Sequence, residues 1–166
     1  GVIQKMHDKG VLTEGRDHLC GYCNLFTTVV SGMPRGYTDD VVAETNLYRE
    51  LFRGRTLETS SVYFGGGTPT MLSIKDLKRT YGALESIAGS FPEGIERAIE
   101  TSPDIVDKAK LKAIKDIGFN RVSVGVQTFN EGVLHYAGRY YDPNLGYQAV
   151  RDALEIGFEN VNADII

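Results

Sequence analysis

The sequence predicts an α/β fold in which short strands alternate with helices. From position 38 onward, the hydrophobic pattern switches repeatedly between the helical and the strand period. Residues 117–119 and 156–158 both read Ile-Gly-Phe at predicted helix ends thirty-nine residues apart, and a valine follows three residues after each phenylalanine. Alternating βα units predict a parallel sheet with right-handed crossovers, a rule that a Rossmann-like sheet and a (β/α) barrel both satisfy.

The first predicted elements are a helix, a strand and a second helix. After Thr38, mostly apolar residues recur at helical spacing until Gly54 supplies a stop signal: Val41, Thr45, Tyr48 and Phe52. Residues 60–64 form a β-rich run that ends in glycines. A second helix is predicted from Ser73, because Asp76 occupies the capping-box position. Its apolar stripe is Ile74, Leu77, Tyr81, Leu84 and Ile87.

The second half of the chain repeats this alternation. Residues 96–101 form the next predicted strand, and a helix follows over about 103–117, with Pro103 in its first turn and Gly118 as its C-terminal cap. Residues 121–129 form another strand, and His135 and Tyr136 are predicted to lie in the loop after it. A helix over about 144–156 precedes a last strand at 160–166.

Composition restricts the class of protein. A chain of 166 residues is one ordinary domain. Its 18 basic and 22 acidic residues give a net charge of −4 with the basic residues scattered, so we expect no nucleic-acid partner. No apolar run approaches the roughly twenty residues that span a bilayer, and no signal-peptide pattern opens the chain. We therefore expect no membrane partner and a cytoplasmic location.

Two cysteines lie close together near the start of the chain. Cys20 and Cys23 are separated by two residues, which suits metal or redox chemistry. Half-buried thiols, a reversible disulfide and a zinc site with His18 are alternatives. A thiol-disulfide oxidoreductase needs a cysteine at a helix N-terminus, but the apolar run at residues 25–30 is β-like.

A glycine turn follows the first predicted strand. Gly65, Gly66, Gly67 and Thr68 precede Pro69 at a point where the chain reverses and its backbone can approach a ligand closely. A purely structural βα turn is the alternative. A dinucleotide motif would require spaced glycines that open a helix, whereas here the helix is predicted to wait until Ser73.

In this order and with these neighbours, the cysteine pair and the glycine turn resemble the radical S-adenosylmethionine (radical SAM) superfamily. Within it, they are similar to the branch of oxygen-independent coproporphyrinogen III oxidase. The resemblance runs from about Asp17 to the end, so we assign nothing to residues 1–16 and predict an incomplete radical SAM core over 17–166. It implies a partial (β/α) barrel with about four and a half βα units present, cut from a longer protein.

The resemblance also implies two cofactors, a 4Fe-4S cluster and S-adenosylmethionine. Cys20 and Cys23 match the second and third cluster ligands, whereas Arg16 stands where the family has its first cysteine. A guanidinium has no lone pair to give a metal, so we expect a poor or labile cluster.

The remaining site residues also follow from the resemblance. Tyr22 matches an aromatic beside the adenine, with a plain core tyrosine as the alternative. The glycine turn is expected to bind the methionine end of the cofactor. Polar contacts to the ribose, carboxylate and adenine side are implied for Glu100, Gln127, Arg139 and Asp164. Independently of the family, the glycines, Glu100, Gln127 and Asp164 fall at or near predicted strand ends, where barrel active sites lie.

The implied activity is reductive cleavage of S-adenosylmethionine to a 5′-deoxyadenosyl radical, followed by hydrogen abstraction from a substrate. The implied partners are a small-molecule substrate, with a porphyrinogen as one candidate, and an electron donor protein. The alternative is a non-catalytic relative that lacks the cluster, or a haem- or cofactor-binding module that keeps the glycine turn.

Overall fold

The computed structural model describes residues 22–23, 34–55 and 57–166. The elements in this part of the chain are α2 (Tyr37–Leu51), β1 (Ser61–Phe64), the 3-10 helix η1 (Pro69–Met71), α3 (Ile74–Ala88), β2 (Glu96–Thr101), α4 (Lys108–Ile117), β3 (Arg121–Gln127), α5 (Glu131–Tyr136), α6 (Pro143–Ile156) and β4 (Asn160–Ile165). The predicted alternation of strands and helices is confirmed.

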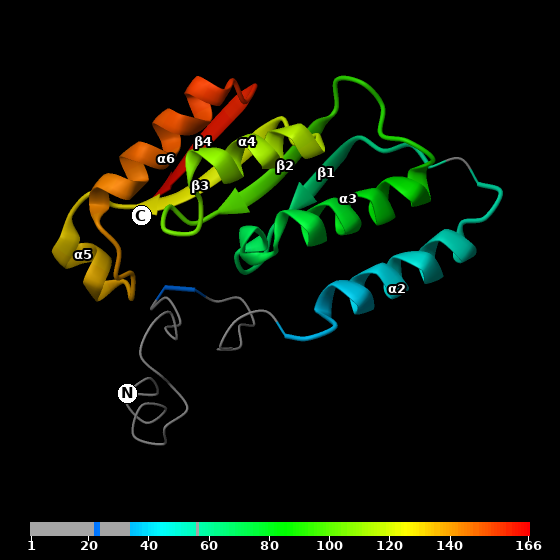
Figure 1. Cartoon of the computed structure of the whole chain (residues 1–166), viewed down its shortest axis with the longest axis horizontal. Helices are drawn as coiled ribbons and strands as arrows, with labels where there is room; N and C mark the ends of the chain where they lie inside the picture. Colours follow the sequence, from blue (N-terminus) through cyan, green and yellow to red (C-terminus); the bar gives the residue numbers. More distant parts are fainter. Residues whose placement is uncertain (1–21, 24–33, 56) are drawn as a thin grey trace, which may run out of the picture.

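The four strands form one parallel sheet in the order β1-β2-β3-β4. Helices α3, α4 and α6 lie side by side over the sheet, and α2 packs on the outer side of α3 (Figure 1). The described residues hold three complete βα units and a fourth strand. The further β-like run predicted at 25–30 lies outside them.

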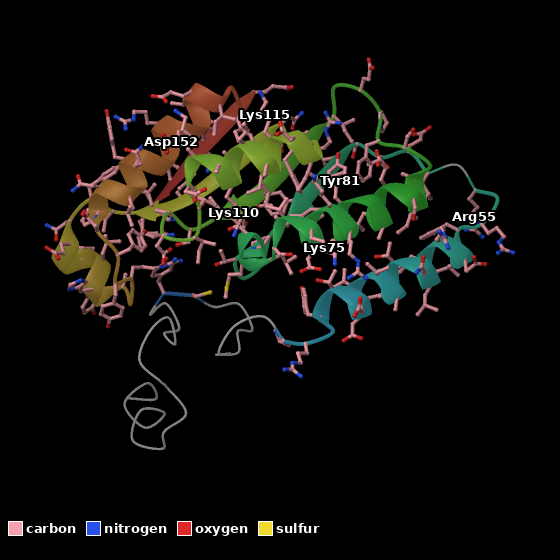
Figure 2. All side chains as sticks on the ribbon, in the orientation of Figure 1. Arg55, Lys75, Tyr81, Lys110, Lys115 and Asp152 are labelled. Atoms are coloured by element: carbon pink, nitrogen blue, oxygen red, sulfur yellow. The ribbon has the colours of Figure 1, made fainter. Side chains whose placement is uncertain are left out.

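The hydrophobic core lies between these helices and one face of the sheet. Phe64 of β1 meets Phe119 edge to face at 4.9 Å between ring centroids. Tyr81, which Figure 2 labels on α3, meets Phe119 at 5.2 Å. Leu77, Leu111 and Ile114 of α3 and α4 are fully buried beneath them. The alternate positions of the strands carry mostly polar side chains on the other face: Ser61, Tyr63, Glu96, Glu100, Arg121, Ser123, Asn160, Asn162 and Asp164.

Asn120 joins three strands at their N-terminal edge. Its side-chain oxygen accepts a hydrogen bond from the Arg97 backbone N–H at 2.8 Å, and its amide nitrogen donates to the Ile95 carbonyl at 2.9 Å. Its backbone carbonyl accepts from the N–H groups of Glu159 and Asn160. These contacts align the starts of β2, β3 and β4, and they therefore help to align their C-terminal ends.

Two predicted boundaries are wrong. Helix α4 begins at Lys108 rather than near Pro103, because Asp107 caps it by accepting from the Lys110 N–H at 2.7 Å. Strand β3 ends at Gln127 rather than at residue 129, because Gln127 has a φ of +64° and leaves the extended conformation.

Two short helices were not predicted. Pro69–Met71 form η1, so a helical turn follows the glycines before Ser73. His135 and Tyr136 lie in α5 rather than in a loop, and Asn130 caps this helix by accepting from the Val133 N–H at 3.0 Å.

Helix α2 has the predicted position, but its predicted apolar positions are only partly buried. Thr45 is buried, whereas Tyr48 is 47% exposed and stacks on the ring of Phe52 at 6.5 Å. None of the helices in the described part of the chain is long and apolar enough to cross a membrane.

Candidate functional site

The strand-end residues singled out in the sequence gather at one edge of the sheet. Gly65 to Gly67 follow β1 directly, Glu100 is the penultimate residue of β2, Gln127 is the last of β3, and Asp164 is the penultimate residue of β4. Because all four strands are parallel and adjacent, these positions lie along the same C-terminal rim. Their binding roles stay predictions.

The glycine turn requires glycine at two of its three positions. A Cβ on Gly65 would lie 3.0 Å from Cδ1 of Tyr63 and 3.1 Å from Oε1 of Glu100, tighter than ordinary contact. Gly66 has a φ of +107°, which side chains rarely adopt. A Cβ on Gly67 would meet no atom within 4 Å. The turn therefore brings bare backbone beside Glu100.

A buried pair of hydroxyls anchors this turn to the next strand. Oγ1 of Thr70, in η1, lies 2.7 Å from Oγ1 of Thr101, the last residue of β2. Both threonines are buried, and a hydrogen bond shielded from water holds its geometry well. Thr101, the residue after Glu100, thus holds the segment that follows the glycine turn close to the end of β2.

Tyr63 contacts the carboxylate of Glu100. Its hydroxyl donates a hydrogen bond to Oε1 of Glu100. This bond, with burial and the charges of Glu100 and Asp164, raises the pKa of Tyr63 to about 12, although the Arg121 guanidinium acts in the opposite direction. The contact favours the neutral phenol beside the ionised carboxylate.

Asp164 belongs to a polar cluster that spans β3 and β4. Ser123 donates to Asp164 at 3.1 Å, and the Asn162 amide donates to Oδ1 of Asp164 at 2.6 Å and to Oγ of Ser123 at 3.0 Å. Ser123 and Asn162 were not singled out from the sequence. The strand register places Ser123 opposite Asn162, and the periodicity of the sequence does not specify this register.

Gln127 adopts a strained backbone at the rim. With a φ of +64°, it lies at the centre of a tight turn in which the Thr128 N–H donates to the Val126 carbonyl at 2.8 Å. The Tyr141 hydroxyl donates to the carbonyls of Gly125 at 3.0 Å and Val126 at 3.1 Å. Non-glycine residues with positive φ concentrate at functional sites, where surrounding contacts maintain the strain.

Arg139 connects Tyr22, the residue before Cys23, to the rim. Its Nη1 donates to Oγ of Ser102 at 3.0 Å, and its Nη2 donates to the Tyr22 hydroxyl at 3.3 Å. Ser102 follows β2 directly, so Tyr22 lies at the C-terminal edge, where Figure 1 shows residues 22–23 below the strand ends. At 42% exposure, Tyr22 is not the core tyrosine that was the alternative.

The metal ligands are only partly described. Cys23 is a free, exposed thiol. Cys20, Arg16 and His18 lie outside the described residues. Within the described ranges, no group of three or more His, Cys, Asp or Glu side chains could hold a metal ion.

Two hollows, of about 420 and 300 Å³, lie beside the sheet, one between the starts of α2 and α3 and one between β1, including Tyr63, and the end of α3. Neither includes Glu100, Gln127 or Asp164. On the polar face, the carboxylates of Glu100 and Asp164 lie near the rim, whereas Glu96 and Arg121, which form an ion pair at 2.9 Å, begin β2 and β3 at the opposite edge. The two carboxylates near the rim can attract a positively charged group of a ligand.

Comparison with known proteins identifies the family of the chain. The Radical SAM superfamily matches residues 11–166. The chain is 30% identical over 152 residues to the heme chaperone HemW of Bacillus subtilis (strain 168), covering 90% of this chain and 39% of that protein. It is 33% identical over 149 residues to the oxygen-independent coproporphyrinogen III oxidase of Escherichia coli (strain K12), covering 90% of this chain and 32% of that protein.

A solved structure extends the similarity to three dimensions. Coproporphyrinogen III oxidase (HemN) from Escherichia coli, a radical SAM enzyme, superposes with a TM-score of 0.77 at 30% identity, covering 89% of this chain and 34% of that one. The chain therefore belongs to the Radical SAM superfamily. More narrowly, it falls in the branch of HemN and HemW. It spans about a third of the length of these relatives.

Backbone strain at Gln127 can be measured by comparing Gln127→Gly with Gln127→Ala. Both variants lose the side chain, but only alanine keeps the penalty of positive φ, so we expect the glycine variant to be more stable by about 1 kcal/mol. Urea unfolding followed by circular dichroism measures the difference. Equal stabilities, or a more stable alanine variant, would show that the turn at Gln127 is not strained.

Proposed function

We propose that this chain binds S-adenosylmethionine at the C-terminal rim of its sheet, as part of a radical SAM core of the HemN and HemW kind. The observation that carries the proposal is the convergence of the glycine turn and three polar strand ends on one edge of a parallel sheet. Ligands of open parallel sheets bind at this edge because strand ends, loops and bare backbone meet there.

The chemistry of the rim suits the two ends of this cofactor. S-adenosylmethionine carries positive charge on its sulfonium and its amino group, and the carboxylates of Glu100 and Asp164 face the same side of the sheet. Backbone carbonyls of the glycine turn can accept from the amino group. The exposed ring of Tyr22 offers a stacking surface for adenine, and Arg139 a guanidinium for the carboxylate.

The donor set for a 4Fe-4S cluster is incomplete. Three thiolates are needed at such a site in this superfamily, whereas Cys20 and Cys23 supply two and Arg16 supplies none. The residues of this chain therefore do not complete a redox site. When a cluster is bound in the superfamily, it supplies the electron that cleaves S-adenosylmethionine to methionine and a 5′-deoxyadenosyl radical.

The activity of the whole protein is proposed by analogy with its branch. With a complete donor set, it would be a radical SAM oxidoreductase of the coproporphyrinogen oxidase kind, with a porphyrinogen among the candidate substrates, an electron donor protein as partner and a cytoplasmic location. The presence of Arg16 favours a second candidate, a non-catalytic relative or a haem- or cofactor-binding module that keeps the rim.

Titration of the chain with S-adenosylmethionine by isothermal calorimetry tests the proposed site. We expect saturable binding, and we expect Glu100→Gln to weaken it by about tenfold or more, because a hydrogen bond to a charged acceptor is lost. Glu93→Gln is the matched control, since Glu93 is exposed and precedes β2 at the opposite edge. Binding that both variants leave unchanged would place the site elsewhere. Product analysis for 5′-deoxyadenosine then separates binding from cleavage.

Anaerobic reconstitution with iron and sulfide tests the donor set. We expect the chain to hold a labile cluster with well under four irons, and Arg16→Cys to raise the iron content because it completes the three thiolates. Arg35→Cys adds a cysteine outside the motif and controls for adventitious iron. A stable, near-stoichiometric cluster in the unaltered chain would contradict the assignment of Arg16.

A further inference from the structure

Tyr63 contacts two elements of the rim at once. It lies on β1, on the polar face of the sheet, and its hydroxyl donates to Oε1 of Glu100. Its ring covers Gly65, since a Cβ added there would collide with the ring edge. One side chain therefore connects the first glycine of the turn with the strand-end glutamate.

The hydrogen bond leaves the other carboxylate oxygen of Glu100 available. Among the described residues, Oε2 of Glu100 has no hydrogen-bond partner, and Glu100 is half-buried rather than fully solvated. A hydrogen bond at one oxygen restricts the orientations that the carboxylate can adopt, and the second oxygen keeps its lone pairs for other donors. Less ordering is then needed when this oxygen accepts a hydrogen bond from a ligand.

The sequence provides the space that this arrangement needs. Tyr63 can lie along its own strand toward the rim only because residue 65 has no side chain. The phenol also stays neutral, since the hydrogen bond to Glu100, burial and the charges of Glu100 and Asp164 all raise its pKa and only Arg121 lowers it. It therefore acts as a hydrogen-bond donor to the carboxylate over the whole physiological pH range.

We infer that Tyr63 is a positioning residue for S-adenosylmethionine: its hydroxyl orients Glu100 and its ring fixes Glu100 relative to Gly65. The inference rests on the proposed function, binding of this cofactor at the rim. Tyr63 itself is 59% exposed and lies outside the hydrophobic core, so its part in the site is separable from the fold.

Tyr63→Phe removes the hydroxyl and keeps the ring. We expect S-adenosylmethionine to bind about fivefold more weakly, with an unchanged melting temperature. Tyr147→Phe, at a 65% exposed tyrosine on α6, is the matched control and should change neither. Because the hydroxyl acts through Glu100, Tyr63→Phe should change affinity less than twofold in a Glu100→Gln background. A purely structural role for Tyr63 would not produce this loss of additivity.

Spectrophotometric titration of the tyrosines tests the hydrogen bond between Tyr63 and Glu100 in the absence of the cofactor. The unaltered chain should show a phenol with a pKa of about 12, and this pKa should fall toward 10 in Glu100→Gln. Because the pKa of Tyr63 is raised in the folded chain, the phenol keeps its proton and its hydrogen bond to Glu100 below pH 10, and it loses both as the pH rises through about 12.

The outcomes distinguish the two proposals. Normal binding by the unaltered chain together with unchanged binding by Tyr63→Phe would overturn the positioning role alone. Additive effects of Tyr63→Phe and Glu100→Gln would overturn it as well. Absence of cofactor binding by the unaltered chain would overturn the proposed function, and the positioning role with it.

Discussion

Parallel pairing of four adjacent strands is the constraint on which the site depends. Since β1, β2, β3 and β4 are neighbours in that order and all run the same way, every carboxyl end lies on one edge. Residues about a hundred positions apart in the chain, from Gly65 to Asp164, are brought together by this pairing alone. Asn120 at the opposite edge and the Thr70–Thr101 pair at the rim fix the strands at their two ends.

The two faces of the sheet differ: one packs against the helices, and the other carries polar side chains. On the first, Phe64, Tyr81 and Phe119 form an aromatic cluster that binds helix to sheet. On the second, hydrogen-bonded pairs and clusters hold Glu100 and Asp164 in place while leaving them accessible. The strained residue Gln127 lies at the C-terminal end of β3, and the Tyr141 hydroxyl stabilises its turn. Stability thus comes from one face, and the ligand contacts that we propose come from the other.

Much of this arrangement follows from the sequence because it depends on local signals. Apolar periodicity and the glycines after β1 locate the strand ends, so Glu100, Gln127 and Asp164 could be placed at one edge before any coordinates. The start of α4 was placed too early, because Pro103 precedes the helix and the Asp107 side chain caps it instead. The positive φ of Gln127 was not predicted either, and the Tyr141 hydroxyl that contacts its turn comes from a later loop. The contacts of Tyr63 and of Ser123 with Asn162 require the strand register, which periodicity does not specify.

Backbone hydrogen exchange, measured by mass spectrometry with and without S-adenosylmethionine, tests the central claim most directly. The account predicts cofactor-dependent protection at residues 65–68 and at the ends of β2 and β3, and none around Asn120 at the other edge. Protection confined to the N-terminal edge or to the hollow between α2 and α3 would contradict it, as would exchange that the cofactor leaves unchanged throughout.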